Sequence, residues 1–364
     1  MPAYFRTIIL SCSLILIGLL AGLIGGLVVV SIFLTRVQPE PMIIQKEREI
    51  VPVFGSTEED NFLRARVQLE GGIAGFYRKR TTEGERPLLT DFLENGVALT
   101  TDGWIMTLDN NLLDDTQTWI VWLQGTAYTP EAVVHDPATT ALFVKINASN
   151  IPIARFSDAD DAKLLGERVF AITHDGQVMR TAVQQIGGVY DGSPGVYLRT
   201  TETLSRRMLL QDAWQEAFLG SPVYSTDGSI IGVMEHTSAD PTTVRILPLS
   251  LVRDVLNQVF KNQNIVRTLL GVQYRQEINR AHPDASRTII TASPKRAAVV
   301  KGSPAADAGL REGDVLLMIN NAFVDGGKDF AEMVQEYKPE TVFVLTYERN
   351  GQEQKERITL QPIP

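Results

Sequence analysis

Short apolar runs divided by turn signals constrain the fold of this chain more than any other feature. The sequences Asp102-Gly103 and Asp227-Gly228 are such turn signals. The runs themselves lie at residues 97–99, 104–107, 119–123, 141–146, 169–173 and 230–234. Many short strands at this spacing predict a β-barrel or a β-sandwich. Residues 250–259 carry apolar side chains at helical spacing after Ser250, a suitable N-cap, and predict a helix that closes this domain.

A second feature is an uncharged stretch near the N-terminus. Residues 8–34 are 27 residues without a charged side chain, about 40 Å as a helix at about 1.5 Å per residue. A hydrocarbon core of about 30 Å needs less than this, and a cleaved signal peptide has a shorter apolar region. We therefore expect residues 1–36 to form a retained, single-pass membrane anchor, followed by a stalk over residues 37–60. The charges on its flanks do not decide the orientation.

Charge and composition argue against several classes of function. The net charge is −9 with a pI of about 5.1, and an anionic surface repels phosphate backbones, so we expect no nucleic-acid partner. The sequence has no Cys/His cluster, phosphate-binding loop or dinucleotide fingerprint, so we expect no cofactor and no metal. Asp158, Asp160 and Asp161 are spaced loosely like a calcium loop, but no glycine or glutamate follows in register. A solvated loop or a helix start is the simpler interpretation.

Five segments in a fixed order carry a resemblance to a known family. They are Asn95-Gly96-Val97-Ala98-Leu99, Asp102-Gly103-Trp104-Ile105-Met106-Thr107, Asp136-Pro137 before Ala141 to Ile146, Gly220-Ser221-Pro222-Val223, and Asp227-Gly228-Ser229-Ile230-Ile231-Gly232-Val233. With the C-terminal region, they resemble the HtrA/Deg (high-temperature-requirement) trypsin-like serine proteases. The resemblance implies a mainly β fold, in which residues 61–262 form a chymotrypsin-like double β-barrel with the active site between the barrels. It also implies a trimer.

The residues at the three catalytic positions of that family depart from its pattern. The resemblance places Asn110 where the family has histidine, Thr140 where it has aspartate and Leu219 where it has serine. Acyl transfer of this class needs a hydroxyl nucleophile, an imidazole base and a carboxylate that orients the imidazole. None of the three side chains supplies its part. Ser221 is a poor substitute nucleophile, because Pro222 follows it directly where the family has two intervening glycines.

Residues 265–364 look like a PDZ domain of the type found in bacterial proteases. Leu269-Leu270-Gly271-Val272 would offer backbone N–H groups to a terminal carboxylate, and a peptide would add as a strand between the following residues and a helix over 329–337. Phe330 and Val334 share one face of that helix at i, i+4 spacing. They either line the peptide groove or pack only in the core of the domain.

These observations predict a membrane-anchored, catalytically inactive HtrA-like pseudoprotease, not an enzyme, that binds peptides or protein C-termini as an adaptor or scaffold. The soluble domains would lie outside the cytoplasm by resemblance to the family. Two alternatives remain. One is an active serine endopeptidase with non-standard catalytic residues, and the other is a structural partner of an active HtrA paralogue.

Overall fold

A computed structural model describes residues 66, 69–79, 87–108, 112, 116–188, 198–213, 215–235, 243–277, 286–325 and 328–364. The chain divides into two units, Met1–Ser56 and Thr57–Pro364, and all described residues belong to the second. Among them, no helix has the length and apolar character needed to cross a membrane. The expected anchor at residues 1–36 and the stalk at 37–60 lie outside the described residues.

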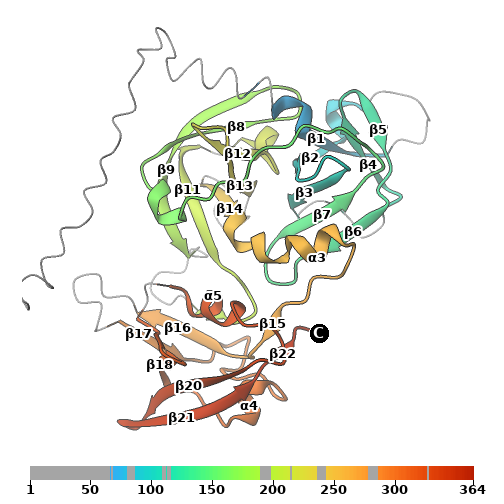
Figure 1. Ribbon diagram of the computed structural model, residues 1–364. Helices are drawn as coiled ribbons and strands as arrows, with labels where there is room; N and C mark the ends of the chain where they lie inside the picture. Colours follow the sequence, from blue (N-terminus) through green and yellow to red (C-terminus); the bar gives the residue numbers. More distant parts are fainter. Residues whose placement is uncertain are drawn as a thin grey trace, which may run out of the picture. The chain divides into compact units, whose positions relative to one another are not determined.

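The first half of the described chain forms a seven-stranded antiparallel sheet, which curls on itself in Figure 1. Its strands, in order of pairing, are β5 (Thr126–Tyr128), β4 (Trp119–Leu123), β1 (Ile73–Arg78), β2 (Phe92–Ala98), β3 (Trp104–Leu108), β7 (Ala141–Lys145) and β6 (Ala132–His135). Trp104 to Leu108 are all buried, which agrees with the unbroken apolar run seen in the sequence. The predicted strand at 119–123 coincides with β4.

The next strands form a closed antiparallel barrel. Around it run β11 (Arg206–Ala213), β14 (Thr243–Pro248), β13 (Ile230–Glu235), β12 (Pro222–Ser225), β8 (Arg168–Ile172) and β9 (Val178–Gly188). Its interior is packed with apolar side chains, among them Val223, Met234 and Ile246, each 0% exposed. The prediction of a barrel-based, mainly β protease fold is confirmed at this level.

The helix predicted over residues 250–259 is only partly present. The chain instead makes two short 3-10 turns, Leu249–Leu251 and Arg253–Val255, and the α-helix α3 spans Leu256–Phe260. The N-cap position of α3 is Val255 and not Ser250, whose hydroxyl donates to Asp161 Oδ2 at 2.6 Å. The side chain that would have started the helix is therefore used in a long-range contact.

The C-terminal region is a third sheet with two short helices. Its pairing order is β10 (Leu198–Thr200), β16 (Gln273–Glu277), β17 (Arg287–Ile290), β18 (Val315–Ile319), β20 (Val342–Arg349) and β21 (Gln352–Thr359), with β19 (Ala322–Phe323) paired to β18. A two-stranded sheet pairs β15 (Thr268–Leu269) with β22 (Gln361–Pro362), and the helices are α4 (Pro304–Asp307) and α5 (Phe330–Gln335). Asp329 caps α5, in agreement with the predicted helix start. The edge strand β10 comes from the protease-like part of the chain, which the sequence did not predict.

Candidate functional site

Leu219, the predicted nucleophile position, lies in the loop that connects the barrel strands β11 and β12. Only 5% of its surface is exposed, and its side chain belongs to the main core cluster. The loop begins as the 3-10 turn Glu216–Phe218, and the Leu219 N–H donates to the Glu216 carbonyl at 3.1 Å. The isobutyl group fills core space and carries no nucleophilic atom.

The side chain of Asn95, on β2, fixes this loop to the first sheet. Asn95 is 0% exposed, and its Nδ2 donates to the carbonyls of Ala217 at 2.8 Å and Leu219 at 3.0 Å. Its backbone N–H also donates to the Leu219 carbonyl, at 2.8 Å. Gly220 has φ +72°, and a Cβ there would lie 2.1 Å from the Asn95 carbonyl oxygen. The close approach therefore requires glycine.

The imidazole of His174 is connected to this loop by hydrogen bonds through Asn95. Its backbone N–H and its Nδ1 both face Asn95 Oδ1, at 3.0 and 2.8 Å, so Nδ1 is the protonated nitrogen and donates. Nε2 then accepts from the Tyr77 hydroxyl. The ring stacks on Phe92 with centroids 5.3 Å apart. Burial lowers the pKa of His174, opposed by the negative charge of Asp175, and burial with the same charge raises the pKa of Tyr77 to about 12.

Thr140, the predicted aspartate position, precedes β7 of the first sheet and makes a hydrogen bond to a carboxylate from β13 of the closed barrel. Its hydroxyl donates to Glu235 Oε1 at 2.5 Å. Glu235 also forms an ion pair with Arg207 through both carboxylate oxygens, and the two side chains are each 8% exposed. The carboxylate of Glu235 is thus held by a guanidinium, and Thr140 is a third member of this buried network.

The structure offers less information about the other two candidate residues, Asn110 and Ser221. Asn110 lies outside the described residues. Ser221 is 0% exposed, and within the described part of the chain its Oγ has no hydrogen-bond partner. The described hydrogen bonds of the His174 ring are with Asn95 and Tyr77 and do not include Ser221. The assignment of Asn110, Thr140 and Leu219 as altered catalytic positions stays a prediction.

The predicted peptide-binding loop, Leu269 to Val272, connects β15 to β16. Leu269 lies in β15, whereas Leu270 and Val272 are 0% exposed. Gly271 has φ +86°, and a Cβ there would lie 2.2 Å from Ser303 Cβ, so the loop requires glycine at this position. The turn leaves the N–H groups of Gly271 and Val272 available to groups outside the loop, and both have such an acceptor.

Those acceptors belong to residues 201 and 202. The Gly271 N–H donates to Glu202 Oε1 at 2.8 Å, and the Val272 N–H donates to Thr201 Oγ1 at 3.1 Å. In return, the Thr201 N–H donates to the Val272 carbonyl at 3.0 Å. Immediately before these residues, β10 pairs antiparallel with β16, Arg199 opposite Tyr274 and Thr200 opposite Gln273. A strand and a carboxylate therefore already lie on the loop and on its following strand.

Helix α5 forms the second wall of the predicted peptide groove, whose first wall is β16. Gln335 Nε2 donates to the carbonyl of Thr201 at 3.0 Å and to that of Thr268 at 2.6 Å. Phe330 and Val334, the two predicted groove residues, are both 0% exposed with β10 in place, and the Phe330 ring packs edge-on against Tyr274 at 5.4 Å. Their role as groove residues stays a prediction.

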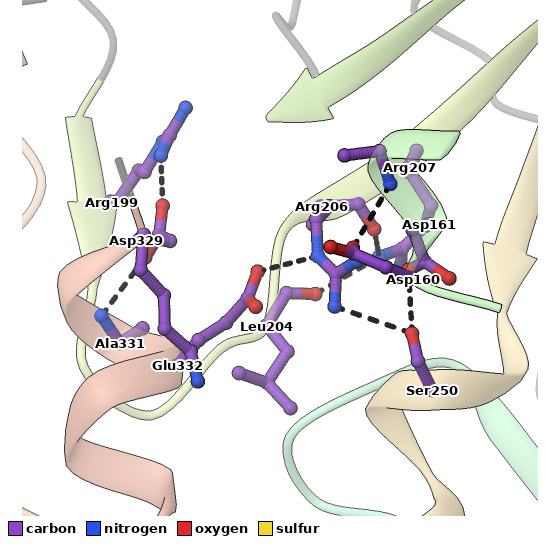
Figure 2. A network of polar contacts seen from close by, with 12 residues as sticks. Asp160, Asp161, Arg199, Leu204, Arg206, Arg207, Ser250, Asp329, Ala331 and Glu332 are labelled. Carbon is purple, nitrogen blue, oxygen red and sulfur yellow. Dashed lines mark hydrogen bonds and ion pairs between the residues drawn. The ribbon is translucent and has the colours of Figure 1, made fainter. Parts of the chain in front are cut away.

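Charged side chains of residues 199 and 206 hold this part of the chain against the N-terminal end of α5, as Figure 2 shows. Arg199 forms an ion pair with Asp329, whose other carboxylate oxygen accepts the Ala331 N–H at 2.9 Å. Further along, the Arg206 guanidinium lies between Glu332, at 2.8 Å, and Asp161. Neighbouring carboxylates raise the pKa of Arg206 against the opposing effect of burial.

Sequence reasoning missed several of these residues. In the sequence, Asn95 belongs only to a strand motif, and no pattern marks Glu202 or Gln335 as site residues. The hydrogen bond from Gly271 to Glu202 joins residues that are 69 apart in the chain, and no local sequence pattern predicts such a pairing. Asp160 and Asp161, considered as calcium ligands, have other partners: Asp160 accepts the Ala162 N–H at 3.1 Å, and Asp161 binds Arg206.

Comparison with known proteins places these features in a family context. Residues 296–349 match the PDZ domain family. A relative from Pseudomonas putida (strain W619), named a probable periplasmic serine endoprotease DegP-like, is 25% identical over 78% of this chain and 59% of its own length. A relative of the same name from Chlamydia pneumoniae is 26% identical over 74% of this chain and 55% of its own. The chain therefore spans less than two thirds of these relatives.

Solved structures agree on the fold. The HtrA-type protease AlgW with decapeptide has a TM-score of 0.62 at 17% identity, covering 83% of this chain and 99% of that one. A serine endoprotease from Yersinia pestis has a TM-score of 0.55 at 17% identity, over 85% of this chain and 99% of that one. The names of the relatives contradict our expectation that the chain is not an enzyme, because those that match most of its described length are named serine endoproteases. The chain is a homologue of the HtrA/DegP-type trypsin-like serine proteases with a PDZ domain.

Proposed function

We propose that the chain binds peptides or protein C-termini in the groove between β16 and α5. One observation carries the proposal: the groove already holds an extended strand, and the Gly271 N–H already binds a carboxylate at 2.8 Å. Main-chain pairing supplies affinity that is largely independent of sequence, and a carboxylate on backbone N–H groups favours a chain end.

A peptide library with random C-termini tests this binding. The full chain in detergent is screened against matched peptides with a free or an amidated C-terminus. We expect the free-acid peptides to bind at least about tenfold more tightly, since a charge-assisted hydrogen bond contributes about 1.5–3 kcal/mol. Equal binding of acid and amide forms would show that the loop does not recognise a terminal carboxylate.

A second proposal, supported by the names of the relatives, is that the chain cleaves peptides as a serine endopeptidase with non-standard catalytic residues. Leu219 offers no hydroxyl, so the reaction needs another nucleophile, and Ser221 is the nearest in sequence. Because Ser221 is 0% exposed, substrate would reach it only after the loop at 216–221 moves.

Labelling with a fluorophosphonate, together with casein digestion, tests this second proposal. We expect labelling and digestion by the unaltered chain and the loss of both in Ser221→Ala. Labelling that persists in Ser221→Ala would assign the nucleophile to another residue. If the chain neither reacts with the probe nor digests casein, this second proposal fails.

We also propose that residues 1–36 anchor the chain in a membrane, with the remainder outside the cytoplasm and assembled as a homo-oligomer. The uncharged stretch at 8–34 supports the anchor, and the word periplasmic in the names of the relatives supports the side. Carbonate extraction of membranes and protease accessibility from the outer side test both. Analytical ultracentrifugation in detergent tests the oligomer, for which the family suggests three copies.

A further inference from the structure

We propose that residues 198–202 of this chain are a built-in ligand of its own PDZ groove, and that they define the peptides that the groove accepts. The proposal rests on the proposed peptide-binding function and adds the ligand class and the competitor that a ligand must displace. The ligand class is a chain end with threonine at the terminus and a cationic side chain two residues before it.

The backbone geometry of the segment is that of a bound chain end. Leu198 to Thr200 pair antiparallel with β16, so the segment runs toward the loop at Gly271. The last of the strand-like contacts comes from Thr201, whose N–H donates to the Val272 carbonyl at 3.0 Å. Gln335 Nε2 holds the Thr201 carbonyl from the side of α5, at 3.0 Å. The segment thus lies between strand and helix, where an added peptide strand would have to lie.

Glu202 supplies the carboxylate that the C-terminus of a bound peptide would bring. Its Oε1 accepts the Gly271 N–H at 2.8 Å and the Thr201 hydroxyl at 2.5 Å, and its Oε2 lies 2.9 Å from the Arg296 guanidinium. If a peptide ended at the position of Thr201, its terminal carboxylate would lie beside the same loop. The side chain of Glu202 therefore takes the place of a terminal carboxylate in a segment that has no chain end.

Two side-chain positions of the segment set the specificity. Thr201 is 0% exposed and its hydroxyl oxygen accepts the Val272 N–H at 3.1 Å, so the terminal site fits a small hydroxyl side chain. Two residues earlier, Arg199 forms an ion pair with Asp329, whose side chain is 8% exposed, and donates to Gln276 Oε1 at 3.0 Å. This acidic site favours arginine or lysine at that position of a competing peptide.

Displacement of the segment must cost affinity. When only a fraction of molecules has an open groove, the apparent Kd equals the intrinsic Kd divided by that fraction. Arg199 and Glu202 make the charged contacts of the segment, whereas the groove itself is made by other residues. Removing these two side chains should therefore open the groove without altering its walls.

The test measures fluorescence anisotropy of a labelled Val-Tyr-Leu-Arg-Thr-Thr peptide with the full chain in detergent. We expect the double variant Arg199→Ala, Glu202→Ala to bind the free-acid peptide at least about tenfold more tightly than the unaltered chain, because two charged contacts no longer hold the segment. Replacing the arginine of the peptide by alanine, or amidating its end, should weaken binding to the double variant by about tenfold each.

Matched variants separate the possible outcomes. The double variant Arg155→Ala, Asp227→Ala also removes one arginine and one carboxylate, from an exposed ion pair outside the groove, and should bind as the unaltered chain does. Glu202→Gln keeps the shape of the side chain, so it remains usable if the double variant folds poorly. Its affinity for the peptide should lie between those of the unaltered chain and the double variant. Equal affinity for the unaltered chain and for both groove-opening variants would overturn the built-in ligand while leaving peptide binding intact. No binding by folded variants of either kind would overturn the proposed function itself.

Discussion

At the scale of single residues, Asn95 connects three parts of the protease-like region. Its amide and backbone bond the loop at 217–219, and its Oδ1 accepts from His174. A buried polar group that loses its partner costs about 1–3 kcal/mol, so the amide holds several groups that would otherwise be unsatisfied. The position of Leu219 thus depends on Asn95.

Asn95→Ala should therefore destabilise the chain by about 3 kcal/mol or more, because the carbonyl of Ala217 and the Nδ1 of His174 lose their partners. Urea unfolding followed by tryptophan fluorescence measures the change. The exposed Asn257→Ala is the matched control and should shift the free energy of unfolding by less than about 0.5 kcal/mol. A change in Asn95→Ala as small as in the control would contradict the anchoring role.

His174 gives a pH dependence whose sign follows from its environment. Burial lowers its folded-state pKa below the ordinary 6.5, so the unfolded chain takes up the proton first as the pH falls. This contribution to stability is complete above pH 6.5 and is lost as the pH falls from 6.5 toward the lower folded pKa. Protonated Nε2 also can no longer accept from Tyr77.

We expect the free energy of unfolding to fall between pH 7.5 and pH 5, and His174→Gln to reduce that fall. Chemical unfolding at several pH values measures the slope. The exposed Asn257→Ala serves as control, because it changes no titratable group, and should retain the slope of the unaltered chain. A His174→Gln variant with an undiminished slope would assign the pH dependence to other groups.

At the scale of elements, most strands could be predicted and one helix could not. Apolar runs bounded by turn residues located β4 and β7 to within a residue, since buried strands need continuous apolar sequence. Residues 250–259 have a helical pattern, yet Ser250 bonds Asp161, and the helix begins only at Leu256. Local patterns do not contain the long-range partner that the Ser250 side chain bonds.

The same limit applies to the candidate site. The turn at Gly271 could be anticipated from the Leu-Leu-Gly-Val sequence, because glycine tolerates the positive φ found there, whereas its role in peptide binding stays a prediction. The addition of β10 to β16 could not be anticipated, since Leu198 to Thr200 carry no signal that distinguishes a PDZ edge from a barrel. The contacts of Glu235 with Thr140 and Arg207 could not be predicted from the sequence either. Residue types were readable from the sequence, whereas their partners were not.

The pair of Arg207 and Glu235 joins β11 to β13 inside the barrel region. Arg207→Ala leaves a carboxylate that is 8% exposed without its guanidinium, and breaking such a pair costs about 3–5 kcal/mol. The double variant Arg207→Met, Glu235→Leu should recover much of that loss, because no charge remains buried. Thermal unfolding of the single and double variants checks both. A double variant that is less stable than Arg207→Ala would show that the network stabilises by more than charge pairing.

At the scale of the whole described molecule, the protease-like and PDZ regions share one continuous core. The main cluster of buried apolar side chains includes Phe143, Val233, Val259 and Phe330. An ion pair outside residues 198–206 also crosses the same boundary. Arg267 binds both oxygens of Asp136 at 2.9 and 2.5 Å, with side-chain exposures of 5% and 0%. We therefore expect the proposed opening of the groove to be a local event, because Arg267 and the core can hold the two regions together while residues 198–202 leave.

We expect Arg206 to limit this opening, since it joins Asp161 to Glu332 on α5. Arg206→Ala leaves two carboxylates, 7% and 10% exposed, without their shared cation. The local opening free energy should fall by about 1–3 kcal/mol, so the Thr201 amide should exchange about tenfold to hundredfold faster. Hydrogen exchange read by mass spectrometry measures this, with Arg155→Ala as the exposed-arginine control. The amides of β3, inside the first sheet, should keep their exchange rates, because the opening leaves that core packed. If β3 and Thr201 accelerate together, the two regions open as one unit and the groove has no separate motion.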